Sequence, residues 1–242
     1  MIREIANLIY PVLCQLCGKK IGEENKNLCG ECLKKIKKRI PPFCLKCGRQ
    51  LSGIPDIQTI CTDCEKNNIY FDRVFSAFEY NGDLKKLVHN FKYNKITSLT
   101  KDFVEWTMDF MKEYSIGNKA NLILSIPMHP LRLFIREINP SHILAKNIAK
   151  KSNIQYSGKF LKKIKNTASQ SKLNRLNRLE NIKGSLSIRK KDKVNVLHKR
   201  ILLVDDLFTT GSTINECAKI LKAQGASYVE AITLARNDRL SS

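Results

Sequence analysis

The residues best suited to chemistry in this chain lie in one short segment, residues 201–213. An apolar run at 201–204 is followed by two carboxylates, Asp205 and Asp206, and then by a turn rich in hydroxyl groups. Such an apolar run is typical of a strand buried on both faces of a parallel sheet. We expect this strand to end at the two acidic residues and a helix to begin near Ser212.

The turn after the carboxylates has the chemistry of a phosphate site. Its hydroxyls and amides can donate to a phosphate, a helix N-terminus adds partial positive charge, and Gly211 lets the backbone approach closely. Asp205 and Asp206 can only accept hydrogen bonds, which suits a ribose 2′,3′-diol or magnesium-bound waters. A plain strand–turn–helix corner would explain one Asp and one Thr but not the whole string. The segment predicts binding of a phosphorylated ribose by Asp205, Asp206, Thr209, Thr210, Gly211, Ser212 and Thr213.

Eight of the nine cysteines form four Cys-x2-Cys pairs near the N-terminus, arranged as two successive modules. Two thiolates from one tight turn occupy two corners of a tetrahedron around zinc, and a second pair completes it. Four sulfur ligands leave no position for a reacting water, which makes such sites structural. We assign one zinc ion to Cys14, Cys17, Cys29 and Cys32, and a second to Cys44, Cys47, Cys61 and Cys64.

Two other interpretations of these cysteines stay open. One is that the ligand pairs interleave between the modules. The other, a redox role, is the weaker interpretation because thioredoxin-like sites need a single pair. Each module is too short to bury a core, so zinc would supply its folding free energy, about 10–16 kcal/mol per site. The ninth cysteine, Cys217, is expected to be a buried small hydrophobe on a helix.

The charge balance points to an anionic partner. The chain of 242 residues has 43 Lys and Arg against 22 Asp and Glu, a net charge of +21. Nucleic acid or phosphorylated small molecules would fit this excess, although a lysine-rich genome would explain it equally well. Between residues 158 and 200 there are 14 Lys and Arg against Glu180 and Asp192. This stripe favours phosphate backbones, unless it is merely a solvated segment.

The sequence also indicates the compartment of the protein and the succession of its strands and helices. No apolar run is long enough for a membrane span and no signal-peptide pattern is present, so we expect a cytoplasmic protein with reduced cysteines. Residues 1–14 have the spacing of a short helix. Strands are expected at 74–80, 122–126, 160–164, 201–204 and 228–234, with helices following residue 83 and at 103–111, 141–150 and 212–224. This alternation indicates an α/β domain.

Several motifs together resemble one known family. The 201–213 segment resembles the signature of type I phosphoribosyltransferases, and the cysteine modules precede it as a double zinc ribbon. With Tyr80-x-Gly82-x-Leu84, Phe91-Lys92-Tyr93 and Pro127-x-His129-Pro130-x-Arg132, the chain is similar to the ComF family, which is linked to bacterial competence. The resemblance covers nearly the whole chain.

The resemblance implies a fold and further site residues. The fold would be α/β, a type I phosphoribosyltransferase-like parallel sheet with helices on both faces, over residues 69–242. A small Cys-rich double zinc ribbon with a short N-terminal helix would occupy residues 1–68. The ligand would be phosphoribosyl pyrophosphate with magnesium chelated by its pyrophosphate. The pyrophosphate would contact Pro127, Met128, His129 and Arg132, under a hood carrying Thr167, Gln170, Ser171, Arg178 and Asn181.

The chain departs from the family in one stretch. Where the family has Arg-Gly-Phe-Asn-Gln after the Arg132 position, this chain has Arg136, Glu137, Ile138, Asn139 and Pro140. Losing the glycine removes backbone freedom, and the proline removes an amide donor. Both changes weigh against anion contacts from this stretch and against catalysis.

Two functions compete on the sequence alone. The favoured one is a phosphoribosyl pyrophosphate-binding protein that also holds single-stranded DNA and supports DNA uptake. The alternative is an active phosphoribosyltransferase that passes phosphoribose to an unidentified acceptor and releases pyrophosphate; His129, Lys163, Lys165 and Arg178 are its candidate phosphate contacts. The implied partners are single-stranded DNA and a DNA-uptake helicase or recombination proteins. The transferase resemblance also suggests a homodimer, which the residues leave open.

Overall fold

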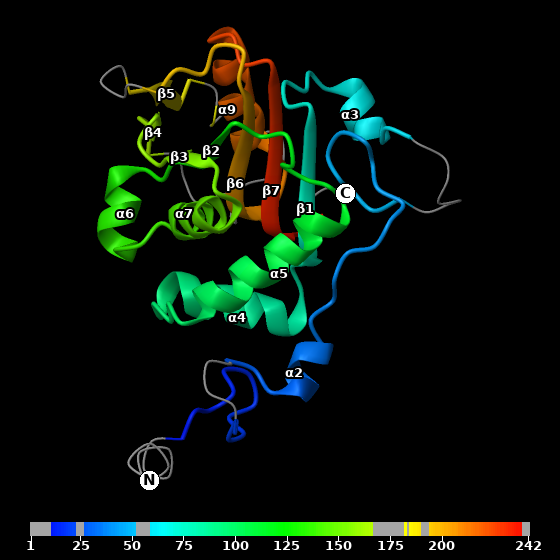
Figure 1. Ribbon diagram of the computed structural model, residues 1–242, viewed down its shortest axis with the longest axis vertical. Helices are drawn as coiled ribbons and strands as arrows, with labels where there is room; N and C mark the ends of the chain where they lie inside the picture. The colour runs from blue at the N-terminus through cyan, green and yellow to red at the C-terminus, as the bar shows by residue number, and fades with distance from the viewer. Residues whose placement is uncertain are drawn as a thin grey trace.

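A five-stranded parallel sheet forms the centre of the computed structural model, which describes residues 11–22, 27–51, 59–166, 182, 184–189 and 194–238 (Figure 1). The strands lie in the order β1-β7-β6-β2-β3 and every neighbouring pair is parallel. They are β1 (Arg73–Glu79), β2 (Leu122–Ser125), β3 (Gln155–Ser157), β6 (Arg200–Phe208) and β7 (Tyr228–Arg236). The predicted α/β fold with a parallel sheet is confirmed.

Helices cover both faces of this sheet. They are α4 (Gly82–Tyr93), α5 (Leu99–Glu113), α6 (Pro130–Arg136), α7 (Pro140–Ser152) and α9 (Ser212–Ala223). Alternate residues of a strand point to opposite faces. Leu202 and Val204 of β6 therefore join one core with α4, α5 and α7, while Ile201 and Leu203 join a second core with α9. Cys217 of α9 is completely buried there, as its sequence position predicted.

One strand prediction needs correction, and a second strand is found outside the main sheet. The strand expected at 201–204 does not end at the acidic pair, because β6 runs on to Phe208, whose register partner on β7 is Arg236. The neighbouring β7 is equally long, so the ladder continues past the carboxylates. The strand expected at 160–164 is present as β4 (Leu161–Lys163), which pairs antiparallel with β5 (Leu186–Ile188) in a separate two-stranded sheet. Among the helices with described residues, none has the length and apolarity to cross a membrane.

The two cysteine modules have the same local geometry. In each, an amide of the glycine that follows the second cysteine donates to the carbonyl of the first, Gly18 to Cys14 and Gly48 to Cys44, at 2.9 and 3.0 Å. Both glycines have the positive φ that this tight turn requires, 73° and 65°. A short helix, α2 (Gly30–Lys34) or α3 (Thr62–Lys66), starts between the last two cysteines of each module.

Each module gathers its own four sulfurs. The ligand atoms of Cys14, Cys17, Cys29 and Cys32, and those of Cys44, Cys47, Cys61 and Cys64, lie within 4.8 Å of one another in each set. One sulfur pair in each module, Cys17–Cys29 and Cys47–Cys61, is 3.7 Å apart, and corners of a tetrahedron with zinc–sulfur bonds of about 2.3 Å are separated by about 3.8 Å. The four thiols therefore fit zinc within each module, and the interleaved alternative is not what the structure has.

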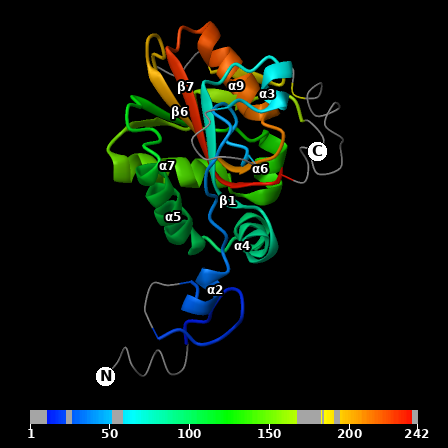
Figure 2. The ribbon, with the colours of Figure 1, turned by 90° about the vertical axis from the view of Figure 1, so that its right-hand side faces the viewer.

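The modules occupy different positions on the domain. The first module lies below α4 and α5, and the second module lies beside β1, as both ribbon views show (Figures 1 and 2). Asn27 of the first module donates to the carboxylate of Asp102 and, at 3.1 Å, to the carbonyl of Ser98 on the α5 side. The second module adds to the sheet edge, where the Val74 amide donates to the Lys46 carbonyl at 2.7 Å. A side chain at Gly48 would collide with the Val74 carbonyl, at 2.4 Å.

Two buried arginines fasten the second module to the end of β7. Arg236 donates to the Cys47 carbonyl at 2.7 Å, and Arg39 donates to the Gly48 carbonyl at 3.1 Å. Both arginines also bind Asp238, Arg39 at 2.5 Å. Burial acts to raise the pKa of Asp238, but Arg236 and Arg39 outweigh it and hold that pKa below its ordinary value. Losing the module would leave these guanidinium groups without their carbonyl acceptors.

We expect Cys44→Ser to destabilise the domain far more than Cys14→Ser. Each variant should lose about one zinc per chain, but only the first should strip acceptors from buried arginines, at a cost of about 3–5 kcal/mol. At about 2–4 °C per kcal/mol, the melting temperature should fall by about 6–20 °C. Thermal unfolding by circular dichroism, with zinc measured by mass spectrometry, checks this. Equal melting temperatures for the two zinc-depleted variants would contradict it.

Candidate phosphoribosyl site

A cavity of about 470 Å³ opens at the carboxyl ends of β2 and β6. Ligands of parallel α/β sheets bind at this edge. All but one of the predicted ribose and phosphate residues, Thr210 being the exception, line it together with the predicted pyrophosphate residues. The residues that line the cavity include Tyr80, Lys85, Lys92, Tyr93, Pro127, Met128, His129, Arg132, Arg136, Asn139, Ser141, Lys163, Asp205, Asp206, Thr209, Gly211, Ser212, Thr213 and Asn237.

The two acidic residues have different partners. Asp206 forms an ion pair with Lys92 of α4 at 2.9 Å, and both side chains are largely buried. Asp205 accepts a hydrogen bond from the Ser141 hydroxyl of α7 at 2.6 Å, and its carboxylate also accepts from the amide of Asp206 at 2.9 Å. Three elements that are distant in sequence therefore hold the two carboxylates in place.

Electrostatics distinguishes the two carboxylates further. Burial, followed by the nearby charge of Asp206, raises the pKa of Asp205 to about 7. The Lys92 pKa is raised as well, because its pairing with Asp206 outweighs the burial that would lower it. The pKa of Lys163 on β4 is lowered by burial and then by Arg132. Near neutral pH the site thus contains a carboxyl group that gains or loses a proton easily.

The phosphate loop has a positive-φ glycine at the start of α9. Gly211, at φ 77°, is the N-cap residue and has no side chain to accept from the helix amides. A Cβ there would meet the Phe208 ring at 2.6 Å, so this position needs glycine for space as well as conformation. Thr210 lies within 2.7 Å of the Ser212 hydroxyl. Amides at a helix start that are not capped by a side chain are suited to bind an anion.

The predicted pyrophosphate residues lie across the cavity, between β2 and α6. His129 is the N-cap residue of α6, and its Nδ1 accepts from the Leu131 amide at 3.2 Å. Since Nδ1 accepts, a neutral His129 ring carries its proton on Nε2, which is then a donor. Burial, then Arg136, lowers the pKa of Arg132. The His129 and Arg132 side of the cavity therefore supplies hydrogen-bond donors, as the phosphate loop does on the opposite side.

The stretch that departs from the family pattern still reaches the cavity. Glu137 takes the left-handed conformation, φ 61°, at the C-cap of α6, so the backbone forms the turn without the glycine. Pro140 is the first residue of α7, where a missing amide costs no helix hydrogen bond, and Asn139 caps the helix by accepting from the Ser141 amide at 3.1 Å. Arg136 and Asn139 both line the cavity.

Several lining residues were not assigned to the site from the sequence. Lys92 lies in the Phe91-Lys92-Tyr93 motif of the family resemblance, which implies no role for it. Ser141 is expected from the sequence only as the start of a helix. Nothing local marks either residue, because their partners on β6 are more than 60 positions away. Lys163, named as a candidate phosphate contact, does line the cavity, whereas Lys165 is not among the described lining residues.

Some predicted residues lie outside the described part of the chain. These are the hood residues Thr167, Gln170, Ser171, Arg178 and Asn181, and much of the basic stripe, including Lys190, Lys191 and Lys193. The N-terminal helix expected over residues 1–14 falls mostly there too.

Comparisons with known proteins agree with this architecture. A family model described as a double zinc ribbon domain matches residues 5–65. A second, described as a phosphoribosyl transferase domain, matches residues 141–241, which include Ser141, the acidic pair and the phosphate loop.

Curated relatives match along nearly the whole chain. Competence protein F of Haemophilus influenzae is 26% identical over 92% of this chain and 96% of its own length. The DNA utilization protein YhgH of Salmonella typhi is 27% identical, covering 95% and 99%. Competence protein ComFC of Bacillus subtilis is 25% identical, covering 98% and 100%. The two cysteine modules, the match to a phosphoribosyl transferase domain and these similarities over nearly the whole chain all agree with the expected resemblance to the ComF family.

Proposed function

We propose that this chain binds phosphoribosyl pyrophosphate with magnesium, and single-stranded DNA, and that it supports DNA uptake. The observation that carries the first part is the convergence of the acidic pair, the phosphate loop and the pyrophosphate residues on one cavity. The relatives named for competence and DNA utilization support the rest.

The charges of the cavity suit a polyanionic sugar phosphate. The lining has Lys85, Lys92, Arg132, Arg136 and Lys163 against Asp205 and Asp206. The 5′-phosphate would bind the start of α9, and the pyrophosphate would bind the His129 and Arg132 side. The two carboxylates would accept from the ribose diol or from magnesium-bound waters. Bound magnesium supplies charge neutralisation between pyrophosphate and protein.

We expect the double substitution Asp205→Asn, Asp206→Asn to abolish tight binding of the ligand. Hydrogen bonds to charged acceptors contribute about 1.5–3 kcal/mol each, so losing two should weaken binding by at least about 100-fold. Isothermal titration calorimetry with magnesium measures this, and Asp109→Asn, at an exposed position of α5, is the matched control. If the folded wild type shows no binding heat, the proposal fails. Pyrophosphate release with a nucleobase panel would support the transferase alternative.

Binding should also strengthen as the pH rises through neutrality. Burial raises the pKa of Asp205 to about 7, so the accepting carboxylate is mostly protonated near pH 6 and mostly ionised near pH 8. A ligand that needs the ionised form should bind about tenfold tighter at the higher pH. The ligand's own phosphates titrate too, so the single variant Asp205→Asn is titrated in parallel. The same pH dependence in both proteins would assign the effect to the ligand.

The single-stranded DNA part of the proposal should show a strong salt dependence. Each neutralised phosphate contributes about 0.7 to the slope of log affinity against log salt for single strands. For a chain with net charge +21 we expect about three to six phosphate contacts and a slope of about −2 to −4. Fluorescence anisotropy with labelled oligothymidine between 50 and 300 mM salt, roughly, measures it. Affinity that does not change with salt would argue against backbone recognition.

A further inference from the structure

Helix α6 exposes apolar side chains that a folded domain normally buries. None of its seven residues is buried. The exposed fractions of Phe134, Ile135 and Leu131 are 84%, 77% and 56%. Contiguous exposed apolar surface of this kind commonly marks a site of interaction with another molecule. Leu131, Phe134 and Ile135 stand at i, i+3 and i+4, so they form one apolar stripe of the kind that a helix normally buries, and in α6 this stripe is exposed.

The surroundings of this helix are cationic and aromatic. The guanidinium of Arg136 lies 4.8 Å from the ring centre of Tyr93 and donates to its hydroxyl at 2.8 Å, while Tyr93 itself remains 51% exposed. No acidic residue occurs within α6. The acid that follows it, Glu137, is paired with Lys95 at 2.5 Å. Helix α6 therefore contributes apolar surface and two arginines but no acid, and the described acid that directly follows it is paired with Lys95.

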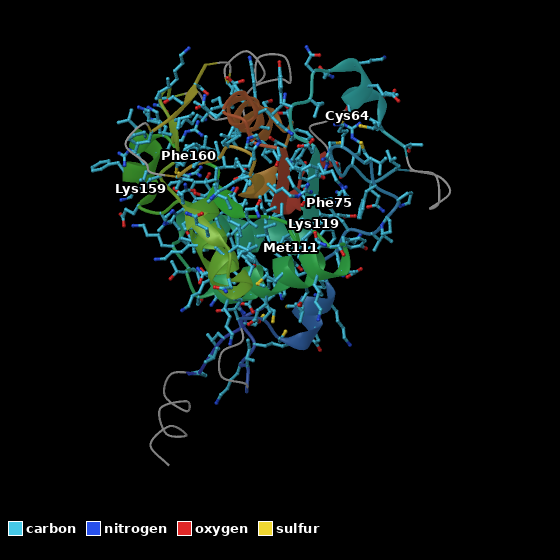
Figure 3. All side chains as sticks on the ribbon, turned by 45° about the horizontal axis from the view of Figure 1, so that its top comes forward. Cys64, Phe75, Met111, Lys119, Lys159 and Phe160 are labelled. Carbon is cyan, nitrogen blue, oxygen red and sulfur yellow. The ribbon has the colours of Figure 1, made fainter. Side chains whose placement is uncertain are left out.

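This surface is continuous with the cavity. Tyr93, Arg132 and Arg136 line the cavity and also border the exposed side of α6. In Figure 1 the helix lies at the margin of the domain, on the opposite side from α3 and the second cysteine module. Figure 3 likewise places Cys64 of that module across the molecule from Lys159 and Phe160, which precede β4. A long ligand on α6 can reach the cavity without meeting the second module.

We propose that α6 and Tyr93 form the platform on which single-stranded DNA stacks its bases, with its phosphates directed to Arg132 and Arg136. This inference rests on the proposed DNA binding and assigns it a surface, in place of the stripe at residues 158–200. Single-strand-binding proteins combine aromatic side chains for bases with cations for the backbone. Phe134, Tyr93 and the two arginines supply that combination.

The charges favour a polyanion over another copy of the chain. In a symmetric dimer through α6, Arg132 and Arg136 would approach the same arginines of the partner, in a chain with net charge +21. Single-stranded DNA supplies the phosphates that neutralise these guanidinium groups. It also supplies flat apolar surfaces for Phe134 and Ile135.

The test compares substitutions at Phe134, whose exposure makes them harmless to folding. Phe134→Ala should weaken oligothymidine binding by about 5- to 150-fold, the loss seen when a stacked base loses its aromatic partner. Phe134→Trp should retain affinity, and Phe134→Leu should lose most of it, because stacking needs a ring. The control Leu197→Ala removes another exposed apolar side chain, 51% exposed, that lies outside this surface. Magnesium-dependent binding of phosphoribosyl pyrophosphate should be unchanged in every variant.

The outcomes separate this inference from the function on which it rests. If the wild type binds no single-stranded DNA, the proposed function itself fails. If the wild type binds and Phe134→Ala binds equally well, the α6 platform is wrong while DNA binding stands. Sedimentation equilibrium provides the remaining check: a wild-type dimer that Phe134→Ala converts to monomer, with DNA affinity unaltered, would overturn the proposal and assign α6 to a second copy.

Discussion

The structure of the site depends on placing two adjacent carboxylates inside the central strand of a buried sheet. Two like charges at neighbouring positions in a low-dielectric environment cannot both stay ionised without partners. Lys92 neutralises Asp206 from α4, and the Ser141 hydroxyl satisfies Asp205 from α7. Because these partners come from one core face of the sheet, the packing of α4 and α7 is also what determines the geometry of the acidic pair.

This constraint explains why Asp205 and Asp206 are not equivalent. Asp206 has the Lys92 cation at 2.9 Å, whereas Asp205 has the neutral Ser141 hydroxyl as its side-chain partner, and burial raises its pKa to about 7. A ribose hydroxyl or a magnesium-bound water can take over as donor to Asp205. Such a donor would stabilise the Asp205 carboxylate in the way that the Lys92 ion pair stabilises Asp206.

The prediction from sequence succeeded where the chemistry is local and fell short where it depends on distant contacts. Each cysteine set and the phosphate loop are contiguous or nearly so. Spacing favoured one zinc site within each module, and the sulfur positions decide against the interleaved alternative. The extension of β6 to Phe208 depends on pairing with β7, and the role of Lys92 depends on α4 packing against the sheet. Strands of three residues, such as β3 and β5, are too short for alternation to be recognised.

The two cysteine modules have unequal relations to the domain although their sequences repeat. Arg236 ends β7, shares Asp238 with Arg39, and lies with its guanidinium 4.3 Å from the ring centre of Phe208, the last residue of β6. Phe208 in turn fills the space beside Gly211 of the phosphate loop. The second module is thus connected through packed side chains to the loop that would bind the phosphate.

The turn after α6 shows a conformational cost accepted beside the site. A non-glycine residue in the left-handed region costs about 1–2 kcal/mol, and Glu137 takes that conformation where the family has glycine. Its ion pair with Lys95 is exposed and offsets at most about 1 kcal/mol of this cost. The turn nevertheless keeps Arg136 against Tyr93 and Asn139 at the start of α7, where its side-chain amide donates to the Ile126 carbonyl at 3.2 Å. The strained turn at Glu137 therefore keeps α6 in this orientation beside the cavity, with its apolar residues exposed. A helix retained at such a cost and left uncovered is better explained by an interaction than by stability.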